Sequence, residues 1–192
     1  MISLLQRGDY RIFVGAFPTG ELADEIQAVR ERYDRKTARI TPPHVTLAGT
    51  YWRVGEAVLG SETAVIDHLH AICRQIRPFS LILGGIRTFG WRVAYLDVEP
   101  TKELRTVRRT LVQSLGQDKH RQFNAHLTLA MRLNKDAMQT MVAEMQQTEW
   151  ENGRFVAPIT HLHLMQRGAN DPAWREIGRF ALAEDRCADD AV

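Results

Sequence analysis

Histidine and threonine occur together in two similar five-residue segments of the chain, His44–Ala48 (HVTLA) and His126–Ala130 (HLTLA). An imidazole, with an ordinary pKa of about 6.5, can accept or donate a proton near neutral pH. A threonine hydroxyl can donate a hydrogen bond to an oxygen that gains negative charge during a reaction. Two such pairs facing each other could therefore take a proton from an attacking water and supply one to a leaving oxygen.

Both segments alternate polar and apolar residues, which is typical of a half-buried β-strand. Successive side chains of a strand point to opposite faces, so each histidine shares a face with its threonine. The apolar residues between and after them, such as Val45 and Leu127, would anchor each strand in a core. Strand formation alone does not require the same polar pair twice. The repeat therefore predicts a paired-histidine active site.

The apolar periodicity predicts the elements that would position these segments. We expect strands at Arg11–Phe17, from His44, at Phe79–Ile86, Trp91–Val98, from His126, around Phe155, at His161–Met165 and at Ile177–Leu182. We expect helices at Glu21–Tyr33, Ser61–Ile76, Lys102–Leu115 and Asn134–Thr148. A strand and a helix precede each histidine segment, so the two halves of the chain should resemble each other.

The composition is that of an ordinary globular protein, with 192 residues of which 44% are hydrophobic and 25% charged, and it excludes disordered and collagen-like chains. A net charge of +2 is too small to identify a nucleic-acid-binding protein by itself. Cys73 and Cys187 predict neither a disulfide framework nor a cysteine metal cluster. Met1–Tyr10 lacks the basic segment followed by an apolar stretch that is typical of a secretory signal peptide. We expect a cytoplasmic, monomeric protein without a membrane partner.

Several segments together resemble the 2H phosphoesterase superfamily, and within it the 2′-5′ RNA ligase-like, or RNA 2′,3′-cyclic phosphodiesterase, family. They are Arg11–Gly15, the two histidine segments and Gly85–Glu99, and the likeness covers Arg11–Leu182. The resemblance implies an α+β fold with two pseudosymmetric lobes. Each lobe would be an antiparallel sheet with helices packed outside, and the lobes would enclose a central groove. We expect residues 1–183 to form this bilobal domain and residues 184–192 a polar tail.

The resemblance also implies roles for the paired residues. His44 and His126 become the catalytic pair, and Thr46 and Thr128 bind the phosphate. The implied reaction is the metal-independent hydrolysis of 2′,3′-cyclic phosphate ends of RNA or nucleotides to 2′-phosphates, without a cofactor and with reversible 2′-5′ RNA ligation by the same groups. The sequence does not fix which histidine is the acid and which is the base; we assign His126 as the base and His44 as the acid.

Two further residues are candidates for substrate binding. Arg132 lies six positions after His126 and would share its strand face if the strand continues that far, although a solvated strand end is an equal interpretation. Phe89 lies in a turn between Thr88 and Gly90, where it could stack on a base or pack in the core. The neighbouring aromatic residues Tyr51, Trp52 and Trp91 have the same two interpretations.

Two other classes of function stay open. His161 and His163 could bind a metal in a metal-dependent phosphohydrolase, although polar positions on a sheet face explain them more simply. A non-catalytic RNA-binding module could use the same groove, and the basic segment Lys119–Arg121 could steer RNA toward it. His68 and His70, two positions apart on a predicted helix, should be solvated.

Overall fold

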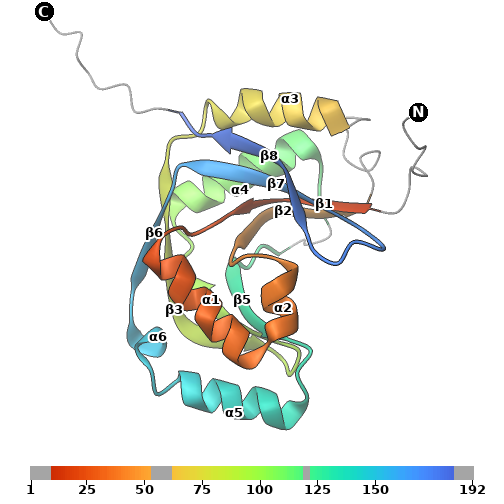
Figure 1. Ribbon diagram of the computed structural model, residues 1–192. Helices are drawn as coiled ribbons and strands as arrows, with labels where there is room; N and C mark the ends of the chain where they lie inside the picture. The colour runs from red at the N-terminus through yellow and green to blue at the C-terminus, as the bar shows by residue number, and fades with distance from the viewer. Residues whose placement is uncertain (1–9, 53–61, 119–121, 184–192) are drawn as a thin grey trace, which may run out of the picture.

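The computed structural model describes residues 10–52, 62–118 and 122–183, and it contains helices and antiparallel strands (Figure 1). The strands are β1 (Tyr10–Ala16), β2 (Val45–Trp52), β3 (Phe79–Phe89), β4 (Val93–Val98), β5 (His126–Met131), β6 (Phe155–Ile159), β7 (His161–Gly168) and β8 (Arg175–Ala181). The helices are α1 (Glu21–Tyr33), α2 (Arg35–Ile40), α3 (Glu62–Cys73), α4 (Lys102–Leu115), α5 (Lys135–Met145) and α6 (Glu149–Asn152). The α+β class is confirmed.

The strands form one antiparallel sheet in the order β6-β3-β4-β5-β2-β1-β7-β8. The sequence predicted a separate sheet in each lobe. The structure corrects this, because β5 and β2 are also paired, through Val45 and Leu127, and join the two halves into one sheet. Four strands lie on either side of this junction, and the two sets are arranged alike. In each set the strand next to the motif strand is the one that precedes it in the chain, β1 beside β2 and β4 beside β5. The two similar halves expected from the sequence are therefore the two halves of a single sheet.

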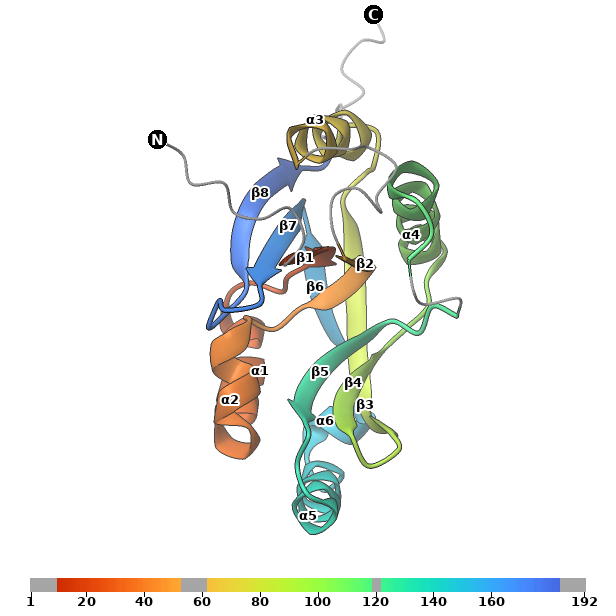
Figure 2. The ribbon, with the colours of Figure 1, turned by 90° about the vertical axis from the view of Figure 1, so that its right-hand side faces the viewer.

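The helices that precede the motif strands cross over to the other half of the sheet. Helix α1, which leads to β2, contacts β5, whereas α4, which leads to β5, contacts β2. Figure 2 shows α1 and α2 on one side of these strands and α4 on the other, with α3 and α5 at opposite ends of the molecule. This exchange packs each motif strand against a helix from the opposite half.

Local sequence explains why α4 begins and ends where it does. The Thr101 side chain accepts a hydrogen bond from the backbone N–H of Leu104, which caps the first turn. Leu104, Val107 and Leu111 are buried at helical spacing against the sheet. Gly116 ends the helix with a φ of 91°, a conformation that favours glycine.

A single apolar core runs through both halves of the sheet. Val45 and Leu47 of β2, and Leu127 and Leu129 of β5, are all buried within it. Burial of each such side chain contributes about 1.5–3 kcal/mol to folding. The alternate residues of the motif strands are therefore fixed on the opposite, more accessible face.

Some predictions lie outside the described residues. They concern the basic segment 119–121, the tail 184–192 and the side chains of Tyr51 and Trp52. Within the described part of the chain, no helix has the length and apolar character needed to cross a bilayer. Helices α2 and α6 are short elements that the sequence interpretation missed.

Candidate active site

The two histidine motifs lie on neighbouring antiparallel strands. Their central residues, Val45 and Leu127, are direct partners in the ladder and point into the core. The same register sets His44 opposite Thr128 and Thr46 opposite His126, with all four half-buried on the other face. The fold thus brings together four polar residues that are far apart in the sequence, in an arrangement related by an approximate twofold axis.

The two imidazoles are oriented in the same way. The Nδ1 atom of His44 lies 2.9 Å from the carbonyl oxygen of Pro42, and that of His126 lies 2.8 Å from the carbonyl oxygen of Asn124. A carbonyl oxygen can only accept a hydrogen bond, so each Nδ1 carries its hydrogen. Each Nε2 atom is therefore the nitrogen available for proton transfer.

Aromatic rings enclose His44. Its ring is stacked on Phe13 and Phe17, with centroid distances of 4.8 and 5.2 Å. A Cβ atom on Gly15, which lies between these two phenylalanines, would come within 2.9 Å of the Phe13 ring. Glycine at this position therefore leaves room for the rings that hold the imidazole.

The electrostatic surroundings of His44 favour its neutral form. Burial lowers its pKa to about 4, and the positive charges of Arg30 and His126 act in the same direction against the hydrogen bond to Pro42. Arg30 is itself buried, and its guanidinium donates to Gln27 Oε1 at 2.9 Å and to the Thr37 carbonyl at 3.1 Å. At pH 7 His44 is thus an unprotonated imidazole that can accept a proton.

His126 lies against a different pair of rings. Phe89 meets it edge-on at 4.9 Å, and Tyr95 lies at 5.3 Å. Phe89 also stacks on Tyr95 at 4.3 Å, yet 36% of it stays exposed. The sequence left open whether Phe89 packs in the protein or is available to stack on a base. Phe89 packs on Tyr95 and still has an exposed surface beside His126.

A buried ion pair holds the first motif strand. The Arg108 guanidinium on α4 binds the Asp118 carboxylate through two hydrogen bonds, of which the Nη2–Oδ1 bond is 2.8 Å long. Arg108 also donates to the Leu47 carbonyl at 2.8 Å, and Asp118 accepts from the Gly49 N–H at 3.0 Å. Gly49 has a φ of 126°, and a Cβ there would lie 2.9 Å from the Phe13 Cα, so only glycine fits.

Asp34 holds the second motif strand in the equivalent way. Its Oδ2 atom accepts from the Met131 N–H at 2.9 Å, and its Oδ1 atom caps α2 by accepting from the Thr37 N–H at 3.0 Å. These hydrogen bonds lower the pKa of the carboxyl against the opposing effect of burial. Met131 and Gly49 both lie five residues after a motif histidine, so each half supplies the carboxylate that fixes the motif strand of the other half.

Comparisons with known proteins identify the family of the chain. A family model described as the 2′-5′ RNA ligase superfamily matches residues 18–171. The chain belongs to this superfamily. The "Putative phosphoesterase" of Oceanobacillus iheyensis is 25% identical over 175 residues, which cover 90% of this chain and 98% of that protein. The protein of the same name from Bacillus licheniformis is 26% identical over 169 residues, 86% of this chain and 95% of that protein.

Solved structures share the fold of this 2′-5′ RNA ligase superfamily member. E. coli LigT complexed with 3′-AMP matches with a TM-score of 0.59 at 19% identity, over 92% of this chain and 99% of that chain. The TT0787 protein of Thermus thermophilus matches with a TM-score of 0.53 at 19% identity, over 91% of this chain and 99% of that chain. E. coli LigT is also known in complex with ATP.

The other predicted site residues have mixed outcomes in this superfamily member. Strand β5 ends at Met131, so Arg132 does not continue the strand face of His126 as its spacing suggested. It adopts a φ of 62° and is exposed, and its N–H donates to the Arg92 carbonyl at 2.8 Å. Together with burial and the charge of Arg167, its charge lowers the pKa of Arg11 on β1.

The two histidines of β7, His161 and His163, each have a partner beside them. His163 pairs through Nδ1 with Glu176, and its ring lies 4.8 Å from Phe17, whereas His161 lies 3.0 Å from the Thr160 hydroxyl. Within the described ranges, no three histidine, cysteine, aspartate or glutamate side chains form a group suited to a metal ion.

One of the two histidines of α3 departs from the prediction that both are solvated. His70 is exposed as expected, with its ring 4.8 Å from that of Phe180, whereas His68 is half-buried and its buried Nε2 atom has no hydrogen-bond partner among the described residues. The reason is that α3 packs on β7 and β8.

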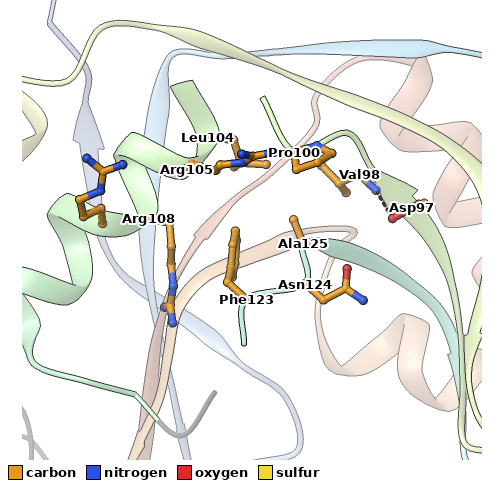
Figure 3. A pocket seen from close by; sticks show the side chains of 10 residues that line it. Asp97, Val98, Pro100, Leu104, Arg105, Arg108, Phe123, Asn124 and Ala125 are labelled. Atoms are coloured by element: carbon orange, nitrogen blue, oxygen red, sulfur yellow. Dashed lines mark hydrogen bonds between the residues drawn. The ribbon is translucent and has the colours of Figure 1, made fainter. Parts of the chain in front are cut away.

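A cavity of about 530 Å³ adjoins the loop before His126 (Figure 3). Its lining includes Asn124, whose carbonyl orients His126, and Asp97, the ladder partner of His126. Figure 3 shows Phe123 beside Arg108, whose guanidinium lies 5.0 Å from the ring centre. This wall of the cavity therefore includes Arg108, which holds β2, and lies beside the loop that orients His126.

Proposed function

We propose that this protein is a metal-independent phosphoesterase that hydrolyses 2′,3′-cyclic phosphate ends of RNA or nucleotides to 2′-phosphates. The observation that carries the proposal is the Val45–Leu127 pairing, which gathers two imidazoles and two hydroxyls on one face. The two four-strand halves would form the walls of a groove with one motif on each wall. Two proton-transfer groups and two hydrogen-bond donors are what opening a cyclic phosphodiester requires.

In the proposed reaction, His44 acts as the general base and His126 as the general acid. Neutral His44 takes a proton from water, the water oxygen bonds to phosphorus, and the bond from phosphorus to O3′ breaks. Protonated His126 delivers its proton to O3′, which leaves a 2′-phosphate and a 3′-hydroxyl. This assignment reverses the one made from the sequence, because the lowered pKa of His44 suits a base better than an acid.

Thr46 and Thr128 would bind the two non-bridging phosphate oxygens. Each hydroxyl can donate one hydrogen bond, which strengthens as negative charge develops on the oxygen it contacts. If a 5′-hydroxyl replaced water as the nucleophile, the same steps would form a 2′-5′ linkage. E. coli LigT, which has this fold, is known in complex with 3′-AMP and with ATP. This supports a nucleotide or RNA as the proposed class of substrate.

The deciding experiment incubates the purified protein with 2′,3′-cyclic mononucleotides and with a cyclic-phosphate-ended RNA, with and without EDTA. We expect 2′-phosphate products at equal rates in both conditions. Complete loss of activity in EDTA, restored by a divalent ion, would instead favour a metal-dependent phosphohydrolase. RNA binding without turnover of any cyclic phosphate would favour a binding module.

Three variants assign the activity to the motif histidines. We expect His44→Ala and His126→Ala to lose turnover while their circular dichroism spectra and melting temperatures stay close to wild type. His161→Ala is the matched control, because His161 is half-buried on β7 and outside the motif pair, so its variant should retain activity. A wild-type rate in either motif variant would remove that histidine from the mechanism.

A further inference from the structure

Two arginines face each other directly on neighbouring strands. Arg11 of β1 and Arg167 of β7 are ladder partners, so their side chains project from the same face. Like charges in this position destabilise a strand pair. Burial lowers the pKa of Arg11, and the charges of Arg167 and Arg132 add to this effect. Guanidinium groups gathered on one face attract and bind anions such as phosphate.

An aromatic path connects this arginine pair to the motif histidine His44. The Arg11 guanidinium lies 5.5 Å from the centre of the Trp174 ring. Trp174 meets Phe13 edge-on at 4.7 Å, and Phe13 stacks on His44 at 4.8 Å. Arg11 and Phe13 are two positions apart on β1 and therefore share a face. The arginine pair thus continues the same surface as the proposed catalytic residues.

Arg132, whose charge acts on Arg11, has an unfavourable backbone conformation. Arg132 has a φ of 62°, and among the described residues it is the only one other than glycine with a positive φ. Such conformations persist where surrounding contacts enforce them, and they cluster at binding and catalytic sites. Here the enforcing contact includes the hydrogen bond from the Arg132 N–H to the Arg92 carbonyl on the β3–β4 hairpin.

We propose that Arg11, Arg167 and Trp174 form a second substrate subsite, which binds the phosphodiester and the base of the nucleotide preceding the cyclic-phosphate end of an RNA strand. The inference rests on the proposed function. Guanidinium groups bind phosphate oxygens through paired hydrogen bonds, and a tryptophan ring stacks on a base of any sequence. A cyclic-phosphate end has a neighbour on its 5′ side only, so one adjoining subsite is sufficient. The preferred substrate is therefore an oligonucleotide rather than a mononucleotide.

The test compares two substrates that differ only in the nucleotides on the 5′ side of the cyclic-phosphate end. They are a 2′,3′-cyclic mononucleotide without a 5′-phosphate and a trinucleotide that ends in the same cyclic nucleotide. We expect Arg11→Gln, Arg167→Gln and Trp174→Leu each to raise KM for the trinucleotide about tenfold, which corresponds to one lost charge-assisted or stacking contact. Turnover of the mononucleotide should stay within twofold of wild type.

A matched control and a second readout separate binding from folding. Arg74→Gln also removes one arginine charge. Arg74 is exposed and directly follows α3, which packs on the buried side of β7 and β8, so both substrates should behave as with wild type. Fluorescence anisotropy with a labelled trinucleotide ending in a 2′-phosphate measures affinity without turnover. Each of the two subsite glutamine variants should lower the slope of log affinity against log salt by about 0.7. Arg167→Lys should recover part of the affinity.

The outcomes distinguish this subsite from the proposed reaction. If wild type hydrolyses neither substrate, the proposed function fails, while weaker trinucleotide binding by the three variants would still support the subsite. Equal losses on mononucleotide and trinucleotide would overturn the subsite and leave the reaction standing. Unchanged trinucleotide affinity and KM in all three variants would overturn it as well.

Discussion

Replacement of Asp118 by asparagine tests how the first motif strand is held. The substitution keeps the size of the side chain and removes the negative charge that Arg108 contacts. The Asp118 side chain is 1% exposed and that of Arg108 10%, so the variant leaves a buried positive charge without its counter-ion. Breaking such a pair from one side destabilises a protein by about 3–5 kcal/mol. This is a large part of the about 5–15 kcal/mol typical of a domain.

Urea unfolding at pH 7 measures this loss, and Glu99→Gln is the control with the same change of charge. Glu99 pairs with Arg154 at 3.4 Å, but both side chains are more than half exposed, so its loss should change the unfolding free energy by less than about 1 kcal/mol. A value for Asp118→Asn as small as that of Glu99→Gln would refute the reasoning.

The double variant Arg108→Met with Asp118→Leu separates stability from positioning. It leaves no unpaired buried charge, so it should recover most of the lost stability. It still removes the groups that bind the Leu47 carbonyl and the Gly49 N–H, so kcat should stay about tenfold or more below wild type, as expected for displaced reacting groups. Full recovery of kcat in the double variant would show that the pair does not position β2.

Other predictions concern pH and backbone conformation. Because the pKa of His44 is lowered to about 4, its basic form is present above that value, and kcat/KM measured from pH 3.5 to 8 should fall on the acid side near pH 4. An acid limb near pH 6.5 would contradict this assignment. The unfolded chain binds a proton at His44 more readily than the folded one, so urea unfolding should also show stability falling between about pH 6.5 and 4, and less steeply in His44→Ala. Gly49→Ala should destabilise the protein by about 1–3 kcal/mol, because a Cβ would meet the Phe13 backbone. In thermal unfolding, Gly20→Ala is the comparison, since Gly20 also has a positive φ but nothing within 4 Å of the added carbon, so equal losses would exclude the clash with Phe13 as the cause.

Local patterns in the sequence predict the elements better than they predict their pairing. Alternation at both motifs correctly indicates β2 and β5 and the burial of Val45 and Leu127. The Val45–Leu127 ladder, which merges two expected sheets into one, joins residues that no local periodicity relates. Arg132 was misplaced because its spacing assumed that β5 continues past Met131.

The two aspartates were missed for a similar reason. Asp118 and Asp34 bind backbone N–H groups of Gly49 and Met131, 69 and 97 positions away in the chain. One signal was available, because Asp34 precedes the segment of α2 and aspartate is a preferred helix cap. That signal would have found the helix but not the contact with β5.

The exchange of carboxylates between the halves has a consequence for any divided form of this protein. A cut between β2 and α3 would give one fragment with His44 and Asp34, and another with His126 and Asp118. Each fragment would carry one imidazole together with the anchor for the other fragment's strand, and would lack its own. Neither piece could organise a working site by itself, and activity would return only when the two are mixed and reassociate.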